Sequence, residues 1–202
     1  MDPRPELIIT SFDEKEINEY IEKLNQITMT YGQDQSIVVK IDSLGGSTHG
    51  LSNLFEALKT VKNPIITYTT SKAMSAGAIL LSAAGSPGMR FASPNSSIML
   101  HEISAGTIGH IEDMENEISM FKANNEQWLG ILAKSMGMKN SQDIRNLIKT
   151  RGTGRELYLT AEEAKELNVV DNVGYLDISP IMGYNVNVTL ATPAKKQNKR
   201  RK

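Results

Sequence analysis

The stretch that organises this chain is IITYTTSKAMSAGAILL, from Ile65 to Leu81. Its first six residues are β-branched, aromatic or Thr and predict a strand, whereas the apolar run after Ser75 predicts a buried helix. A serine at the start of a helix lies beside unpaired N–H groups and the positive end of the helix dipole, which favour negative charge. Its small neighbours would let a substrate backbone approach the hydroxyl closely. The simpler alternative is a small-residue helix packed on a sheet, because an isolated A-x-S-x-G pattern often occurs by chance.

A second strand-to-helix turn lies upstream and contains two adjacent glycines. Residues 36–42 predict a mostly buried strand, and apolar residues recur at helical spacing over 51–61. Gly45 and Gly46 lie between these elements, where paired glycines let the backbone turn with its N–H groups exposed. These N–H groups either hold an anion or only form the bend.

The chain alternates strands and helices over most of its length. Capping-box patterns at Ser11/Glu14 and Thr160/Glu163 mark two helix starts. Strands are expected at 6–10, 36–42, 63–70, 89–92, 97–100, 156–159 and 169–173, and helices at 14–31, 51–61, 76–85, 111–136, 141–148 and 160–167. This order predicts one α/β domain on a mostly parallel sheet, over residues 1–180. Residues 181–202 are expected to form a C-terminal extension that ends in a disordered basic tail.

Composition narrows the possible functions. The chain has 202 residues and no cysteine, which excludes disulfides, thiolate catalysis and cysteine-based zinc sites. Its net charge of −1 includes six basic residues in 195–202; without them 16 basic residues face 23 acidic ones. A mildly acidic body argues against nucleic-acid binding, except through the basic tail. The N-terminus lacks the features of a signal peptide and no apolar run could span a bilayer, so we expect a cytoplasmic protein with no membrane partner.

Of the three histidines, His101 has the most plausible role in a site. It ends an apolar strand at the same edge as the turn after Thr70, so its imidazole can reach a hydroxyl there. A histidine titrates near neutrality and can take the Ser75 proton during attack and return it to a leaving amine. His49 is expected to face solvent, and His110 to lie near the start of a long helix. The residues alone leave the third, orienting carboxylate open.

Competing motifs are weaker. Lys72 could pair with Ser75 in a dyad, but a lysine there is expected to face solvent. Ser119 and Lys122 fit S-x-x-K inside the long helix without the companion motifs. No phosphate loop, dinucleotide fingerprint or H-E-x-x-H motif occurs, so no cofactor and no metal are expected.

Four blocks, in order, resemble the successive signatures of the Clp protease proteolytic subunit. They are residues 42–47 (DSLGGS), 73–78 (AMSAGA), 90–101 (RFASPNSSIMLH) and 157–164 (LYLTAEEA). The resemblance implies the ClpP/crotonase fold of repeated β-α units with a long protruding handle helix. It also implies a serine endopeptidase in which Ser75 is the nucleophile, His101 is the base, and Gly46 and Ala76 offer backbone N–H groups to the oxyanion.

The sequence departs from this family in three places. The third triad member is an aspartate in the family and Glu156 here, although the same orienting role is expected. His101 is followed by Glu102 and Ile103, where the family usually has Gln-Pro. The N-terminal axial segment, which helps to engage an ATP-driven unfoldase, has almost no counterpart in Met1 to Pro5, so weak or no ATPase coupling is expected. Divergent members of this kind resemble phage-encoded relatives, some of which are capsid-maturation proteases acting in the host cytoplasm.

The expected partners are a peptide or unfolded protein substrate and further copies of the chain. An apolar stripe along 111–132 is expected to pack on another subunit. The resemblance implies that the assembly consists of stacked heptameric rings that enclose the active sites. A Clp-type ATPase is a candidate partner. Alternatives are a crotonase-like CoA thioester enzyme and a catalytically silent structural subunit of a mixed ring.

Overall fold

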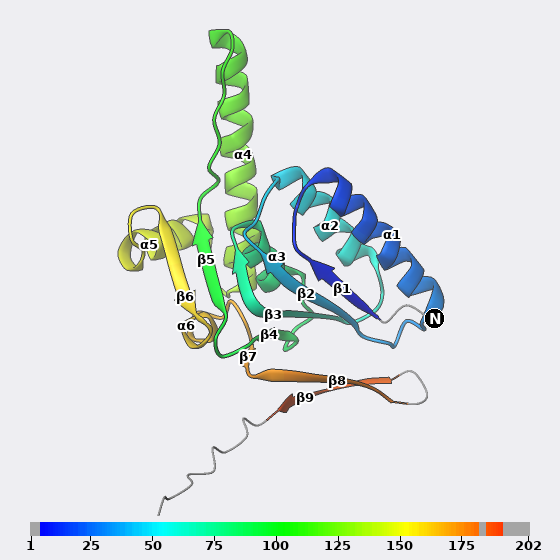
Figure 1. Ribbon diagram of the computed structural model, residues 1–202. Coiled ribbons are helices and arrows are strands. Elements are labelled where there is room, and N and C mark those ends of the chain that lie inside the picture. Colours follow the sequence, from blue (N-terminus) through cyan, green and yellow to red (C-terminus); the bar gives the residue numbers. More distant parts are fainter. Residues whose placement is uncertain (1–4, 182–184, 192–202) are drawn as a thin grey trace, which may run out of the picture.

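The computed structural model describes residues 5–181 and 185–191, with side chains up to residue 177. Up to residue 173, helices and strands follow the predicted order, whereas the two strands at residues 175–181 and 185–191 are not among the predicted ones (Figure 1). The strands are β1 (Glu6–Ile9), β2 (Ile37–Ser43), β3 (Ile65–Met74), β4 (Arg90–Ala92), β5 (Ser97–His101), β6 (Glu156–Thr160), β7 (Asn172–Val173), β8 (Tyr175–Ile181) and β9 (Asn185–Ala191). The helices are α1 (Glu14–Thr30), α2 (Thr48–Thr60), α3 (Ala76–Ala84), α4 (Ile111–Ser135), α5 (Ser141–Arg151) and α6 (Ala161–Glu166).

The main sheet is mostly parallel, as predicted. Its path is β1-β2-β3-β4-β7, and all of these pairs are parallel. Strand β3 is shared along one edge: residues 67–69 pair with β4, and residues 72–74 pair with β5. Strand β6 then pairs antiparallel with β5. The carboxyl ends of β2, β3 and β5 therefore lie close together, which is where ligands bind in many parallel sheets.

Strand β3 begins at Ile65 and extends four residues further than predicted at its carboxyl end, to Met74 rather than Thr70. Its last three residues pair with Ser97, Ile98 and Met99 of β5, so strand pairing imposes the extended conformation on a segment of low β-propensity. Only Ser75 separates β3 from α3. The turn is consequently tighter than the sequence indicated.

The helix caps differ in detail from the prediction. Helix α1 begins at Glu14 with Asp13 as its N-cap, so the capping box predicted at Ser11 is wrong. The Ser11 hydroxyl instead donates to the Asp13 carboxylate and accepts from its N–H. The capping box of Thr160 and Glu163 is confirmed for α6.

Helix α4 protrudes from the domain, and residues 102–110 run along it toward its outer end (Figure 1). The apolar stripe predicted along α4 divides into two parts. Trp128 and Leu132 are buried in the core of the same chain, where the Trp128 ring packs edge-on against Phe55 at 5.5 Å. Ile111 and Ile118 remain exposed. Only the outer half of the helix therefore presents apolar side chains to solvent, and the prediction that the whole stripe faces another subunit is wrong for the inner half.

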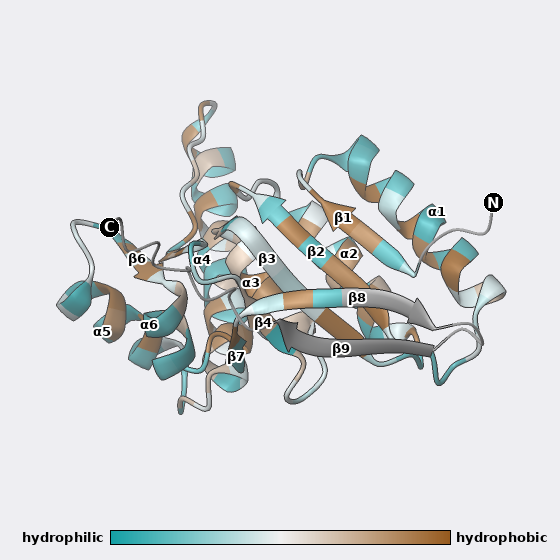
Figure 2. Ribbon diagram, turned by 60° about the horizontal axis from the view of Figure 1, so that its bottom comes forward, coloured by the Kyte–Doolittle hydropathy of each residue, from teal (hydrophilic) through white to brown (hydrophobic). Residues whose placement is uncertain are grey.

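The two faces of the sheet are covered differently. Helices α1, α2 and α3 pack their buried apolar residues on one face and form the main core. A smaller cluster of Val38, Ile66, Tyr68 and Phe91 lies on the other face, and Leu176 of β8 packs against it. Figure 2 shows the hairpin of β8 and β9 crossing this face. The hairpin pairs residues on both sides of the boundary predicted at 180/181. The predicted basic tail, 195–202, lies outside the described residues.

Arg90 ties several elements together behind the sheet. Its guanidinium donates twice to the Asp171 carboxylate, at 3.0 and 2.6 Å, and the Asp171 N–H donates back to the Arg90 carbonyl. The same guanidinium also donates to the carbonyls of Ser82, Ser135 and Asn168. Burial alone would raise the pKa of Asp171, but the hydrogen bonds and charge of Arg90 outweigh it and hold that pKa below its usual range. Arg90 thus joins α3, the end of α4 and the segment after α6 to β4.

Candidate active site

Ser75 lies between β3 and α3 in an unusual backbone conformation. It is the N-cap residue of α3, with φ 55° and ψ −120°, a region that a residue with a side chain rarely adopts. The surrounding hydrogen bonds hold it there: its N–H donates to the Met99 carbonyl at 2.9 Å, and its carbonyl accepts from Ala78 and Ile79. The strained turn presents the hydroxyl at the carboxyl edge of the sheet.

His101 ends β5 next to this turn. Its Nε2 lies 2.7 Å from Ser75 Oγ, which is a hydrogen-bonding distance. Burial lowers the pKa of His101 below its ordinary value, and the negative charge of Glu156 offsets part of this effect. A lowered pKa keeps the imidazole neutral near pH 7. The neutral ring is the form that can accept a proton from the serine hydroxyl.

Gly45 approaches the serine from the end of β2, and the next residue, Gly46, lies against Phe12. Both have positive φ, 104° and 151°, and a Cβ added at Gly45 would lie 2.7 Å from Ser75 Cβ. Gly46 makes no hydrogen bond through its N–H within the part of the chain that the structure describes. Ala76 is the first residue of α3, and the first N–H groups of a helix have no partner within the helix. The two predicted oxyanion donors therefore have no backbone hydrogen-bond partner among the described residues, and their role stays a prediction.

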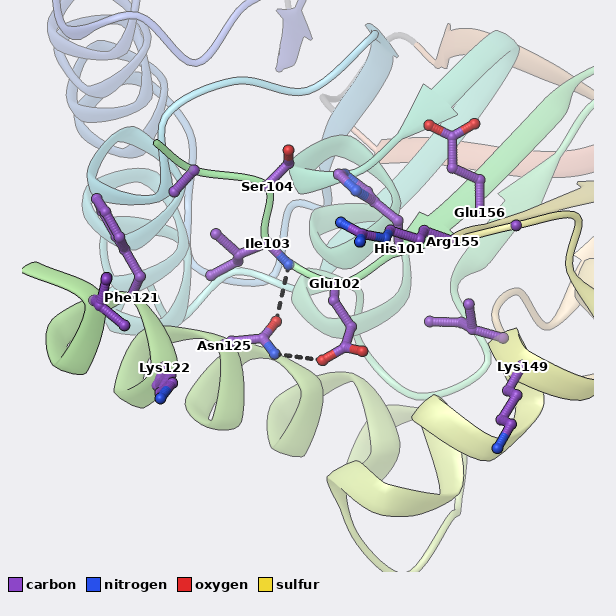
Figure 3. A pocket seen from close by; sticks show the side chains of 14 residues that line it. His101, Glu102, Ile103, Ser104, Phe121, Lys122, Asn125, Lys149, Arg155 and Glu156 are labelled. Carbon is purple, nitrogen blue, oxygen red and sulfur yellow. Dashed lines mark hydrogen bonds between the residues drawn. The ribbon is translucent and has the colours of Figure 1, made fainter. Parts of the chain in front are cut away.

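Glu156 lies directly opposite His101 in the pairing of β5 with β6. Residues opposite each other in an antiparallel pair project to the same face, and Figure 3 shows both side chains in this arrangement. Glu156 Oε2 accepts a hydrogen bond of 2.9 Å from the Tyr158 hydroxyl, and no hydrogen bond joins it to His101 among the described residues. Two other carboxylates that could be considered for the third member, Asp171 and Asp113, lie elsewhere: Asp171 is bound by Arg90, and Asp113 is exposed in the first turn of α4.

The other sequence candidates are not assembled with Ser75. Lys72 lies on β3 and pairs with Asp42 at 2.8 Å, so it is half-exposed and engaged rather than free in solvent. His49 is exposed in the first turn of α2, and His110 is the N-cap of α4. Ser119 donates to the Glu115 carbonyl within α4.

A cavity of about 670 Å³ extends from His101 and Glu156 along the middle of α4 (Figure 3). Its apolar walls come from Ile103, Phe121 and Ile148. A pocket of this size that begins at the histidine can accommodate part of an extended ligand.

Sequence reasoning missed three contributors to this site. Tyr158 is two residues from Glu156 on the same strand, so the two-residue period of a strand could have placed it on the same face. Gly45 touches the serine, although the resemblance drew attention to Gly46. The hydrogen bonds from Asn125 to Glu102 and Ile103 join residues that are far apart in the sequence, and no sequence pattern predicts them.

The described residues contain neither a membrane-spanning helix nor a cluster of metal ligands. No helix there is both long and apolar enough to cross a membrane. No group of three or more potential metal ligands from His, Asp or Glu occurs in the same residues.

The fold agrees with the comparison with known families. The model of the Clp protease family matches residues 6–176, so the chain belongs to the Clp protease family. Its mixed α/β architecture with a parallel sheet is that of this family.

Similar proteins include two bacterial subunits. One is the ATP-dependent Clp protease proteolytic subunit 1 of Rhodococcus jostii (strain RHA1), 36% identical over 141 residues. The other is the ATP-dependent Clp protease proteolytic subunit 2 of Corynebacterium jeikeium (strain K411), 34% identical over 141 residues. Each match covers 69% of this chain, but only 61% and 64% of the two relatives. Nearly two thirds of each relative is therefore represented here.

Proposed function

We propose that this protein is a serine endopeptidase that hydrolyses peptide bonds through an acyl-enzyme formed on Ser75. The observation that carries the proposal is the 2.7 Å contact between Ser75 Oγ and His101 Nε2, at a serine with φ 55° between a strand and a helix. Membership of the Clp protease family supports it. A nucleophile bonded to a base with a lowered pKa is the arrangement that activates a hydroxyl near neutral pH.

In the proposed mechanism, Ser75 Oγ attacks the scissile carbonyl as its proton passes to His101 Nε2. The carbonyl oxygen becomes an oxyanion, which the N–H groups of Gly46 and Ala76 bind. His101 then donates the proton to the leaving amine, and the C–N bond breaks to leave an ester on Ser75. Water, deprotonated by His101, attacks this ester, and the collapse of the second intermediate returns the proton to Ser75.

We propose Glu156 as the third, acidic member. Its position opposite His101 and its effect on the pKa of that histidine support this role, because a nearby negative charge stabilises the imidazolium formed in each step. A glutamate is longer than the aspartate of the family, and the Tyr158 hydroxyl holds its carboxylate. Glu156 therefore acts here through its charge, and would need to leave Tyr158 to bond the histidine directly.

The substrate class is a peptide or an unfolded protein, which reaches the serine in an extended form. We propose that the chain works as a homo-oligomer, in stacked heptameric rings held through the exposed outer half of α4, where Ile111 is 75% exposed. Both relatives are named as subunits of an ATP-dependent protease, so a Clp-type ATPase is the candidate partner for folded substrates, and we propose that its coupling to this protein is weak. A short peptide needs no unfolding and should be cleaved without ATP.

The test compares the natural protein with Ser75→Ala. A serine-reactive fluorophosphonate should label the natural protein at Ser75, and a fluorogenic peptide should be hydrolysed without ATP. Ser75→Ala should lose both properties while its mass in solution stays the same. An unlabelled natural protein without peptidase activity would instead identify a silent ring subunit, and labelling at another serine would refute the assignment.

A further inference from the structure

We propose that Asn125 is a positioning residue for His101, because its side-chain amide fastens the segment that follows His101 to helix α4. The inference deepens the proposed function, since it rests on His101 as the base. Asn125 lies within α4, 24 positions after the histidine in the sequence, and its amide lines the same cavity as His101.

Both ends of the Asn125 amide are used. Its Oδ1 accepts a hydrogen bond of 2.9 Å from the N–H of Ile103, and its Nδ2 donates to Glu102 Oε2 at 2.7 Å. Figure 3 draws both contacts. One side chain therefore holds the backbone and the carboxylate of the two residues that directly follow His101.

The backbone itself provides little support at this point. The pairing of β5 with β6 ends at His101 and Glu156. In the described part of the chain, residues 102–109 make no backbone–backbone hydrogen bond, and they belong to no helix or strand. The position of the His101 ring depends on the course of the chain on both sides of it. On the side that follows, Asn125 supplies the first fixed contact.

A second helix strengthens the same contact. Arg145 of α5 donates through Nε to Glu102 Oε2 at 2.9 Å, and its Nη2 pairs with the carboxylate of Glu126 of α4. Burial would raise the pKa of Glu102, but the hydrogen bonds from Arg145 and Asn125 outweigh it and lower that pKa. Glu102 thus stays ionised as the acceptor between two helices. Asparagine is a poor helix former, so the helix itself gains nothing from it at this position.

The experiment compares Asn125→Ala with Glu126→Gln in the full-length protein. Glu126 is the adjacent residue on α4 and the other partner of Arg145, and within the described part of the chain no hydrogen bond joins its side chain to residues 102–110. Two measurements are made below the unfolding temperature of both variants. The first is the rate of Ser75 labelling by a fluorophosphonate. The second is the pKa of His101, from hydrogen–deuterium exchange at the imidazole Cε1 read by mass spectrometry.

We expect Asn125→Ala to lower the labelling rate by about 10- to 100-fold, the scale for a misplaced catalytic group. The pKa of His101 should rise toward its ordinary value, because a loosened segment admits water to the ring. Glu126→Gln should change neither quantity. Asn125→Asp keeps the acceptor for Ile103 but replaces the donor to Glu102 with a second carboxylate that repels it, so it should also lower the labelling rate.

Equal labelling rates and equal His101 pKa values in Asn125→Ala and Glu126→Gln would overturn the proposal. The exchange measurement does not depend on catalysis. If the natural protein is neither labelled nor active, the proposed function fails, and the pKa of His101 still decides whether Asn125 positions the ring.

Discussion

Gly45→Ala should inactivate the enzyme through a single methyl group. A Cβ at this position would lie 2.7 Å from Ser75 Cβ and 3.1 Å from Ser75 Oγ. Carbon atoms pack at about 3.5–4.0 Å, so Ser75 or Gly45 would have to move by roughly 1 Å. A displacement of this size breaks the 2.7 Å contact with His101, and misplacing a reacting group by about 1 Å costs about 100-fold in rate.

The matched control is Gly137→Ala. Gly137 also has positive φ, 73°, but an added Cβ there would meet no atom within 4 Å. Alanine therefore strains the backbone at both positions, by about 1–2 kcal/mol for a left-handed residue, and only Gly45→Ala crowds the serine. The assay is kcat/KM on a fluorogenic peptide, with the labelling rate of Ser75 and thermal unfolding measured on the same samples.

Gly45→Ala should lose about 100-fold in both rates, and Gly137→Ala should lose stability alone. If folded Gly45→Ala keeps kcat/KM within a few-fold of the natural protein, the serine turn is not held in the way described. The same conclusion follows if the two variants lose equal activity.

The remaining predictions concern charge and stability. Glu156→Gln should move the acid limb of kcat/KM to lower pH, because the carboxylate raises the pKa of His101; a limb that stays in place would show that the charge does not act on the ring. Tyr158→Phe should free the Glu156 carboxylate to bond His101, so kcat should not fall, and a large fall would mean that Tyr158 itself is required. Arg90→Met should cost about 3 kcal/mol in the free energy of unfolding, because it leaves the 22% exposed Asp171 carboxylate without its cation. The pair stabilises the fold only while Asp171 is ionised, above its lowered pKa. The loss of stability in Arg90→Met, measured by urea unfolding, should therefore shrink as the pH falls below about 4. A loss of stability that does not change with pH would contradict the pairing.

The arrangement of Ser75 and His101 could be predicted because both depend on local sequence. Small residues after a β-branched run predict a strand-to-helix turn, and parallel strands bring their carboxyl ends to one edge. The course of residues 71–74 could not be predicted, because Ser-Lys-Ala-Met adopts a strand only through pairing with β5. The direction of a partly exposed carboxylate such as Glu156 also depends on which donor lies nearest, and that donor is Tyr158.

The hairpin of β8 and β9 shows a different limit. Valine and leucine alternate with polar residues over 185–191, which is the two-residue period of a strand. Isolated two-stranded hairpins are marginally stable in water, so such a pattern becomes a strand only where a surface receives it. Here the cluster around Tyr68 and Phe91 provides that surface, and Leu176 of β8 packs on it. The sequence shows the two-residue period of a strand, but it does not show which face of the sheet the hairpin packs against.

Helix α4 connects the two properties that the proposal needs, assembly and catalysis. Its inner half is part of the core through Trp128, and its outer half exposes Ile111. Asn125 lies between these halves and holds the segment that follows His101. A subunit that packs on the outer half would restrain the helix that Asn125 connects to this segment. Assembly would therefore also restrain the position of His101. A variant that stays monomeric through Ile111→Glu should therefore label more slowly at Ser75 than the assembled protein, although residue 111 lies at the far end of the helix from the buried Trp128.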